Sequence, residues 1–396
     1  MPPMLSWRSN RKILLGITGG IAAYKLPHLV RLIRKAGCEA EVIMTRSACN
    51  FAAPMTLETL SGRKVWTDDA FDGIIPHIRL TDWAEVFVIA PCTANTLAKL
   101  AHGVADNLLT SAAVAASCPV LAFPAMNERM YENPAVQENI AVLKRRGIFV
   151  AEPEAGELAC GVSGKGRMPE PEEIMHELFR ALCVHDMAGK HVLVTAGPTH
   201  EYIDPVRYIS NPSSGKMGVA MARSAWYRGA DVKVIAGPVS VDGWGMSVEH
   251  VVSAQEMLEA VKGSLDWADY VVKAAAVGDY RVKEYSPHKL KREGRDELLL
   301  PLVQNPDIAA EAGKLKREGQ VLVGFAAETD DVAAHAREKL SRKNLDYILA
   351  NDVLAEGAGF AVDTNTLRLI SPTYERVFSG LKEDVAFDVW SALLAD

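Results

Sequence analysis

The sequence predicts an α/β protein made of two doubly wound domains in tandem, each with a parallel sheet. One pattern occurs twice: a short apolar strand runs into glycines and a helical pattern follows, first from residue 11 and again from residue 190. After each start, further apolar strands alternate with helical runs, which is typical of parallel sheets covered on both faces. A length of 396 residues is also too great for one ordinary core and favours two or three domains.

In the first half, the strand that begins at residue 11 leads into a helical pattern over residues 21–35. Four more strands are expected, at residues 40–44, 86–90, 119–123 and 147–151. The apolar run 108–126 is nearly long enough to span a membrane. Because Pro119 and Pro124 interrupt it, we expect a buried helix to residue 118, a buried strand after it, and no membrane span.

The second half repeats this order and adds a different tail. Its first strand, 192–195, is followed by a helix over 214–228 and by strands at 231–236, 270–274, 320–325 and 346–350. The tail predicts strands at 366–370 and 375–378 and a closing helix at 381–394. We therefore expect two Rossmann or flavodoxin-like domains, 1–187 and 188–396. In such folds ligands bind beyond the carboxyl ends of the strands.

Composition excludes several classes of protein. A hydrophobic fraction of 49% and a charged fraction of 23% are those of an ordinary globular protein. The net charge of −7 gives no overall attraction to nucleic acid, so no nucleic-acid partner is expected. The six cysteines form no C-x-x-C pair, which predicts reduced thiols in a cytoplasmic protein. Residues 1–10 lack the apolar core of a signal peptide.

Polar or glycine-rich loops follow the strands of the first half. They are 16–20, 45–47, 91–96 and 124–127, and His77 lies in a further loop ahead of a helical run at 78–83. Glycines let the backbone approach a ligand, and a helix N-terminus attracts an anion. Taken singly, each signal has an ordinary explanation: many turns need glycine for geometry alone, and a lone histidine is more often structural.

Together these loops resemble the flavin-containing cysteine decarboxylase family, and residues 159–168 resemble the substrate-covering loop of phosphopantothenoylcysteine decarboxylases. The resemblance implies a bound FMN that accepts a hydride, so that the substrate loses CO₂ from an oxidised, thioaldehyde form. It implies that His77 handles protons or the substrate carboxylate, that Asn127 orients this carboxylate, and that Cys160 returns a proton. The implied FMN contacts are Gly16, Thr18, Gly19, Ser47, Thr93, Ala94, Asn95, Thr96 and Met126.

The second half has its own set of strand-end residues. Its run of two serines, Gly215 and Lys216 is not a P-loop, because Met217 stands where serine or threonine is required. The run is still suited to hold phosphate at a helix N-terminus. Asp279 comes directly after a strand, where a carboxylate suits Mg²⁺. Lys289, with Lys291 and Arg292, suits a polyphosphate, although such a basic run is by itself more often a solvated surface.

From residue 190 onward the chain resembles phosphopantothenate–cysteine ligase. The resemblance implies that CTP activates the phosphopantothenate carboxylate as an acyl-cytidylate, which the amine of cysteine then attacks. It implies that Asn211 acts near this intermediate and that Asp279 works with the metal. The implied nucleotide contacts are Gly197, Ser214, Gly215, Asp279, Lys289, Asn305, Phe325, Lys339 and Lys343. Gly278, His200 and Pro212 depart from the usual family residues, which affects local loop contacts only.

The two resemblances, in this order, indicate a bifunctional enzyme of coenzyme A biosynthesis. They imply a homo-oligomer with a trimer-based decarboxylase core and a dimeric ligase. Two alternatives remain: a flavin-fold regulatory protein without catalysis, and a prenyltransferase that makes a modified flavin. The presence of His77, Asn127 and Cys160 together with a complete ligase half disfavours both.

Overall fold

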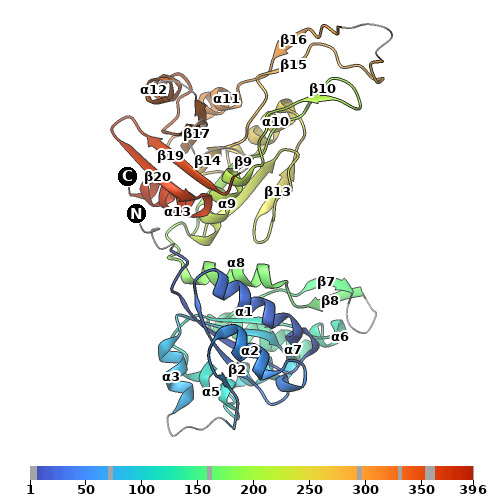
Figure 1. The fold of residues 1–396 in the computed structure, drawn as a ribbon, viewed down its shortest axis with the longest axis vertical. Coiled ribbons are helices and arrows are strands. Elements are labelled where there is room, and N and C mark those ends of the chain that lie inside the picture. Colours follow the sequence, from blue (N-terminus) through green and yellow to red (C-terminus); the bar gives the residue numbers. More distant parts are fainter. Residues whose placement is uncertain are drawn as a thin grey trace. The chain divides into compact units, whose positions relative to one another are not determined.

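The computed structural model describes residues 7–69, 75–157, 163–291, 297–328, 332–352 and 362–395. The chain divides into two compact units, Met1–Cys183 (unit 1) and Val184–Asp396 (unit 2), which Figure 1 shows in blue to green and in green to red. Each unit contains a largely parallel sheet with helices on both faces. The predicted fold class is therefore confirmed.

Unit 1 has a six-stranded parallel sheet in the order β3-β2-β1-β4-β5-β6. The strand order reverses between β1 and β4, and in doubly wound folds ligands bind at this point. The central strands β1 and β4 are buried along almost their whole length, which explains their continuous apolar sequences. The strands are β1 (Lys12–Ile17), β2 (Glu39–Met44), β3 (Val65–Trp66), β4 (Val86–Cys92), β5 (Val120–Pro124) and β6 (Phe149–Val150).

Helices cover both faces of this sheet. On one face α3, α4, α5 and α7 enclose an apolar cluster that includes Leu14, Phe87 and Leu109. On the other face α1 packs against α8. The helices are α1 (Leu26–Lys35), α2 (Pro54–Ser61), α3 (Pro76–Trp83), α4 (Ala94–His102), α5 (Leu108–Ala115), α6 (Glu128–Tyr131), α7 (Pro134–Arg145) and α8 (Pro171–Leu182), with 3₁₀ turns η1 (Ile21–Lys25) and η2 (Ala48–Asn50).

Two helices of unit 1 differ from the prediction in detail. The expected helix 21–35 is the 3₁₀ turn η1 followed by α1, because Pro27 has no N–H to continue one hydrogen-bonded ladder. The helix expected to reach residue 118 ends at Ala115, and the strand after it begins at Val120. Within the described residues no helix has the length and apolarity to cross a membrane.

Unit 2 has an eight-stranded sheet in the order β13-β12-β9-β14-β17-β18-β19-β20. The strands from β13 to β18 are parallel and follow the same path as unit 1, with a reversal between β9 and β14; β19 and β20 add an antiparallel edge. The strands are β9 (His191–Ala196), β12 (Asp231–Ala236), β13 (Ser247–His250), β14 (Tyr270–Lys273), β17 (Val321–Glu328), β18 (Tyr347–Asp352), β19 (Thr364–Ile370) and β20 (Glu375–Leu381).

The helices of unit 2 again form two layers. α10, α11 and α12 share an apolar cluster with Leu193 and Val271 of the sheet. α9 packs against α13, and the Trp390 indole N–H donates to the Met221 carbonyl at 2.9 Å. The helices are α9 (Lys216–Tyr227), α10 (Ala254–Leu265), α11 (Ile308–Leu315), α12 (Val332–Arg342) and α13 (Lys382–Leu394).

Two short antiparallel pairs complete unit 2 and were not predicted. β10 (Glu201–Tyr202) pairs with β11 (Tyr208–Ile209), and β15 (Tyr280–Val282) pairs with β16 (Leu302–Gln304). Figure 1 shows β15 and β16 projecting from the end of the unit 2 sheet. The loop that contains Asp279 leads directly into this projection.

Candidate functional site

In unit 1 the loops that follow β1 and β4 are joined to each other. The Thr18 side chain is only 1% exposed. Its Oγ1 donates to the Pro91 carbonyl at 2.6 Å and accepts the Thr93 N–H at 3.2 Å. The Thr18 hydroxyl therefore fixes the two loops to each other at the point where the strand order reverses. Because Thr18 is buried, neighbouring residues supply the groups that face solvent there.

The glycines of the first loop are required for close packing. A Cβ added to Gly19 would lie 2.3 Å from the Ser47 Cβ, so glycine lets the loops after β1 and β2 touch. A Cβ added to Gly16 would lie 2.9 Å from the Leu109 side chain and 3.0 Å from that of Phe87. Gly16 thus serves the core, whereas Gly19 shapes the exposed end of the sheet.

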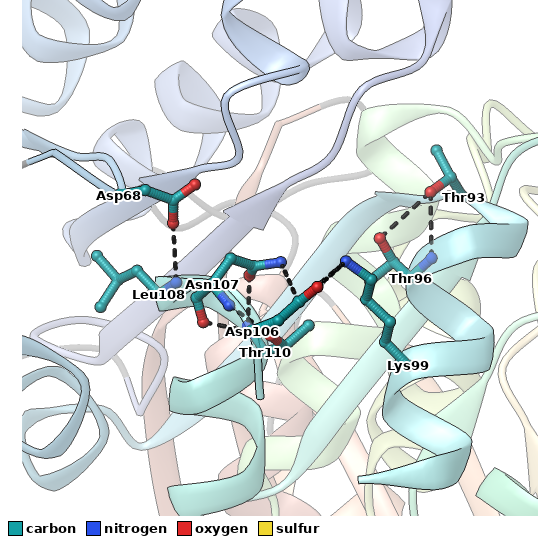
Figure 2. Close-up of polar contacts among 8 residues, drawn as sticks. All are labelled: Asp68, Thr93, Thr96, Lys99, Asp106, Asn107, Leu108 and Thr110. Carbon is teal, nitrogen blue, oxygen red and sulfur yellow. Dashed lines mark hydrogen bonds and ion pairs between the residues drawn. The ribbon is translucent and has the colours of Figure 1, made fainter. Parts of the chain in front are cut away.

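The third loop starts α4 immediately after β4. The Thr93 Oγ1 accepts the Thr96 N–H at 3.3 Å and donates to the Thr96 Oγ1 at 3.2 Å, as Figure 2 shows. These hydroxyls cap the helix, while Ala94 is partly exposed and Asn95 is exposed. A capped helix N-terminus at the reversal of strand order is suited to an anionic group such as a phosphate.

A polar network connects α4 to α5, the next helix along the chain. Lys99 of α4 pairs with Asp106 at 2.7 Å, and the Asn107 Oδ1 accepts the Thr110 N–H at 2.9 Å to cap α5. The Asp68 carboxylate accepts the N–H of Leu108 at 2.9 Å, so the chain after β3 is tied to the same helix start (Figure 2). The network fixes α4 and α5 behind the loop.

His77 lies in the first turn of α3, not in a loop before a helix as predicted. Pro76 is the first helical residue, where its fixed φ is favourable and its missing N–H costs nothing. The His77 side chain is partly exposed, and its carbonyl accepts the Thr81 hydroxyl at 2.9 Å. The start of α3 therefore fixes the backbone at His77.

Asn127 lies where an unpredicted hairpin meets the sheet. The hairpin is β7 (Glu154–Glu157) paired with β8 (Ser163–Arg167). The Met126 N–H donates to the Gly166 carbonyl at 3.0 Å, and the Glu128 carboxylate accepts the Lys165 N–H at 3.1 Å. The loop 126–128 and β8 are therefore bound together.

The Asn127 Oδ1 accepts the Arg129 N–H at 2.9 Å and caps α6. Cys160 belongs to the connection between β7 and β8 and lies outside the described residues, as does Arg292.

Unit 2 has loops joined in the same way at its own reversal point. The Thr195 Oγ1 accepts the Ala275 N–H at 3.2 Å, and the Thr199 Oγ1 accepts the Gly278 N–H at 3.0 Å. The loops after β9 and β14 are thus fixed to each other by threonine hydroxyls, as in unit 1.

A cavity of about 520 Å³ opens at this end of the unit 2 sheet. It is lined by eight of the predicted residues: Asn211, Ser214, Gly215, Asp279, Asn305, Phe325, Lys339 and Lys343. Gly197 does not line the cavity. It adopts φ +82° and lies directly behind Gly215, since a Cβ added to Gly215 would be 3.1 Å from the Gly197 nitrogen. Lys289 also lies outside the lining and is exposed.

Two asparagines shape the loop that carries Asp279. The Asn211 Nδ2 donates to the Val277 carbonyl at 3.1 Å and to the Ala276 carbonyl at 3.3 Å. The Asn305 Nδ2 donates to the Gly278 carbonyl at 2.8 Å. Asp279 itself is exposed. Within the described ranges, histidines, cysteines and acids form no group of three able to hold a metal, whereas one carboxylate with phosphate oxygens is an ordinary Mg²⁺ arrangement.

The cavity also has two lysines that the sequence prediction missed. Lys273 and Lys382 line it together with Lys216, Lys339 and Lys343. Lys343 pairs with Asp307 at 2.9 Å, and Lys216 pairs with Asp363 at 2.6 Å. Lys273 could have been found from the sequence, because it is a charged residue at the end of an apolar strand. It directly precedes the loop that was predicted to carry Asp279.

A buried aspartate holds the segment that contains Lys289. Asp204 is fully buried and accepts the N–H groups of Val206, Arg207 and Leu290 at 2.8, 2.9 and 3.1 Å. Burial alone would raise the pKa of Asp204, but these hydrogen bonds lower it from 3.8 to about 2. Because Leu290 follows Lys289, the Asp204 carboxylate fixes the backbone beside that lysine.

Comparison with known proteins covers both units. Residues 187–395 match the family model of the DNA/pantothenate metabolism flavoprotein C-terminal domain, and residues 5–182 match the flavoprotein model. A relative from Bacillus subtilis (strain 168), coenzyme A biosynthesis bifunctional protein CoaBC, is 45% identical over 98% of this chain and 97% of its own. A protein of the same name from Vibrio parahaemolyticus is 43% identical over 96% and 97%.

Among solved structures, the C-terminal domain of a coenzyme A biosynthesis bifunctional protein CoaBC is 36% identical to this chain. It covers 53% of this chain and 96% of its own, with a TM-score of 0.44.

Proposed function

The chain belongs to the family of bifunctional coenzyme A biosynthesis proteins, and we propose that each of its halves performs one of two consecutive reactions. Residues 188–396 join phosphopantothenate to cysteine with CTP, and residues 1–187 convert the phosphopantothenoylcysteine formed to phosphopantetheine with FMN. The observation that carries this proposal is identity of 43–45% along nearly the whole chain to relatives named as bifunctional proteins of coenzyme A biosynthesis.

The first half fits a bound FMN. Gly19 brings two strand-end loops together where any Cβ would collide with Ser47, and the capped start of α4 lies at the reversal of strand order, where it favours a phosphate. When bound, FMN supplies a reversible hydride acceptor. The fit of the loops and the flavoprotein match over residues 5–182 support the cofactor.

The chain's own groups then act on the substrate. The Asn127 amide orients the substrate carboxylate, and the His77 imidazole holds or moves a proton beside it. Once the thiol carbon is oxidised to a thioaldehyde, the bond to CO₂ breaks and its electron pair moves toward sulfur. Cys160 donates a proton when the ene-thiol is reduced. Replacement Cys160→Ser should let CO₂ leave and block the final reduction; normal phosphopantetheine formation by this variant would refute the role.

In the second half the cavity fits a nucleoside triphosphate. Five lysines line it, and the N-terminus of α9 begins at Gly215 in its wall. The phosphopantothenate carboxylate needs a leaving group before an amine can attack it. Transfer of CMP from CTP, with release of pyrophosphate, supplies one. Asn211 acts near the acyl-cytidylate, Asp279 holds Mg²⁺, and the other predicted residues that line the cavity contact the nucleotide.

The lysine-lined cavity gives the nucleotide phosphates their counter-charges. Lys339 and Lys343 approach them from the α12 side of the cavity, and Lys289 approaches from the segment fixed by Asp204. Such fixed cations stabilise charge that develops on a leaving pyrophosphate.

We also propose a homo-oligomer with a trimeric core of the first half and a dimeric second half. The support for this proposal is the resemblance of the two halves to the decarboxylase and ligase families. Light scattering during size-exclusion chromatography tests this, and a monomer at micromolar concentration would contradict it.

The test of the function is incubation of the purified protein with phosphopantothenate, cysteine, CTP and Mg²⁺. Phosphopantetheine, CO₂, CMP and pyrophosphate should all appear, and a flavin spectrum should accompany the protein. Supplying phosphopantothenoylcysteine without CTP should yield CO₂ and phosphopantetheine, with no CMP or pyrophosphate. Flavin binding without either reaction would instead support a regulatory, non-catalytic protein.

A further inference from the structure

The unit 2 cavity has a buried lysine to which the reactions above assign no part. Lys273 is the last residue of β14, lines the cavity and is only 7% exposed. Its Nζ donates to the Thr195 Oγ1 at 3.3 Å, and that oxygen already accepts the Ala275 N–H. In the part of the chain that the structure describes, its ammonium has no ion-pair partner. Buried cations are ordinarily paired.

The acid that raises the pKa of Lys273 is already paired. Asp307, at the start of α11, forms an ion pair with Lys343 at 2.9 Å. Burial lowers the pKa of Lys273 to about 7, with Asp307 raising it and Lys343 lowering it. In the ligand-free protein near neutral pH, Lys273 is therefore divided between its charged and neutral forms.

The rest of the lining is unbalanced in charge. Five lysines line the cavity, at positions 216, 273, 339, 343 and 382, against two aspartates, at 279 and 307. A polyanion that enters this cavity displaces water and places negative charge within a few ångströms of Lys273. Charge–charge interaction is strong in such surroundings, so the charged form of the lysine is favoured.

We propose that this cavity binds its nucleoside triphosphate together with a proton, and that Lys273 is the group that takes the proton up. The proton comes from solvent and ends on Nζ, and no other bond changes. Lys273 is thus an additional phosphate-binding cation, which is fully protonated only when the ligand is present. The inference deepens the proposed function and rests on it, since it takes CTP as the ligand.

The direction of the pH effect follows. Above pH 7 a growing fraction of Lys273 is neutral before binding and must be protonated on binding, so CTP affinity falls as pH rises. About half a proton should be taken up at pH 7, and close to one at pH 8. The affinity should weaken by up to about tenfold per pH unit above neutrality.

Isothermal titration calorimetry of the full-length protein with CTP and Mg²⁺, without phosphopantothenate or cysteine, measures this uptake. The observed binding enthalpy is plotted against the ionisation enthalpy of several buffers at each pH, and the slope gives the number of protons. We expect a slope near one at pH 8 for the parent protein and near zero for Lys273→Met, whose side chain suits a buried site.

Lys382→Met is the matched control, because Lys382 is also buried, at 5% exposure, and lines the same cavity. It should keep the slope near one. If this variant does not fold, Lys216→Met, which removes a more exposed lysine of the same lining, takes its place.

The possible outcomes distinguish a failure of the proton-uptake inference from a failure of the proposed ligase function. Tight CTP binding with a slope of zero at pH 8 in the parent protein overturns the proton uptake and leaves the ligase proposal intact. A slope that persists in Lys273→Met, or that disappears in Lys382→Met instead, assigns the proton to another group. Absence of CTP binding at any pH overturns both.

Discussion

The two units follow the same strand path but present different chemistry where it reverses. In unit 1 the loops after β1 and β4 are joined by the Thr18 hydroxyl, and glycine, hydroxyl and amide groups surround them. In unit 2 the loops after β9 and β14 are joined by Thr195 and Thr199, but lysines and aspartates line the cavity beyond them. The shared fold fixes where a ligand binds, and the loop residues decide what binds.

The contrast also concerns charge. A flavin ring is flat and neutral and needs close approach of backbone, which Gly19 permits. A nucleoside triphosphate carries several negative charges and needs cations, which unit 2 supplies from β14, α9, α12 and α13. If each reversal point serves one reaction, a substitution at one should leave the other reaction unchanged.

The largest effect is expected for Gly19→Ala. The added Cβ would lie 2.3 Å from the Ser47 Cβ, so two strand-end loops must separate, and misplacement of about 1 Å costs about 100-fold in rate. CO₂ release from phosphopantothenoylcysteine should fall by that factor and flavin absorbance should decrease, while pyrophosphate release stays unchanged.

Gly20→Ala is the matched control for this substitution. Its Cβ would meet the Thr93 side chain at an ordinary 3.7 Å, so activity and flavin content should remain close to those of the parent. Equal loss in both variants would show that the approach of Gly19 to Ser47 is not the reason.

Asn211→Asp should have an effect of similar size, confined to the ligase. The side-chain amide that donates to the Val277 and Ala276 carbonyls becomes a carboxylate that repels them, and a donor near the acyl intermediate is lost. Amide formation should fall about 100-fold, with pyrophosphate release still detectable. Assay of phosphopantothenoylcysteine and pyrophosphate in the same reaction measures both. Unchanged ligation would remove Asn211 from the mechanism.

Asp204→Asn should weaken CTP binding about tenfold, because the amide loses part of the hydrogen bonding that holds the backbone beside Lys289. It also alters acid stability. Since the folded pKa of Asp204 is lowered to about 2, its carboxylate contributes stability that is present above about pH 4 and is lost as pH falls toward 2.

Urea unfolding of unit 2, followed at several pH values between 2 and 5, measures this contribution. The Asp204→Asn variant should show a flatter decline than the parent over this range. Identical pH profiles for the two proteins would mean that Asp204 does not keep its lowered pKa in the folded protein.

The smallest effect is expected for Glu128→Ala in unit 1. The change removes the acceptor for the Lys165 N–H at 3.1 Å and loosens β8 from the loop that carries Asn127. The net loss of one such hydrogen bond corresponds to about a fivefold change, seen as a higher KM for phosphopantothenoylcysteine with kcat little changed. Glu138→Ala, on the exposed side of α7, is the control. A fall in kcat alone would contradict a positioning role.

Periodicity was enough to predict the inner strands of the two sheets, because buried parallel strands leave continuous apolar runs that need no knowledge of their partners. It could not predict β10, β11, β15 and β16, which are only two or three residues long, or the short edge strands β3 and β13. It began the third helix at residue 78, two residues after the observed start at Pro76, because the helix-starting role of Pro76 was not used.

The site residues show the same limit. Motifs identified eight residues that meet in one cavity, but they gave no indication that the hydroxyls of Thr18, Thr93 and Thr96 bond within the protein. Lys273 was missed because its importance comes from burial, and burial depends on β9 and β17, the strands on either side of β14. Asp204 was missed because its hydrogen bonds join segments far apart in sequence.

The central claim is that the two reversal points host separate reactions, and parallel assays of the two variants Gly19→Ala and Asn211→Asp test it most directly. Each folded variant is given phosphopantothenate, cysteine and CTP, and separately phosphopantothenoylcysteine, and pyrophosphate and CO₂ are measured. Gly19→Ala should release pyrophosphate and accumulate phosphopantothenoylcysteine, whereas Asn211→Asp should release CO₂ at the parental rate from phosphopantothenoylcysteine. Loss of both reactions in either variant would contradict the claim.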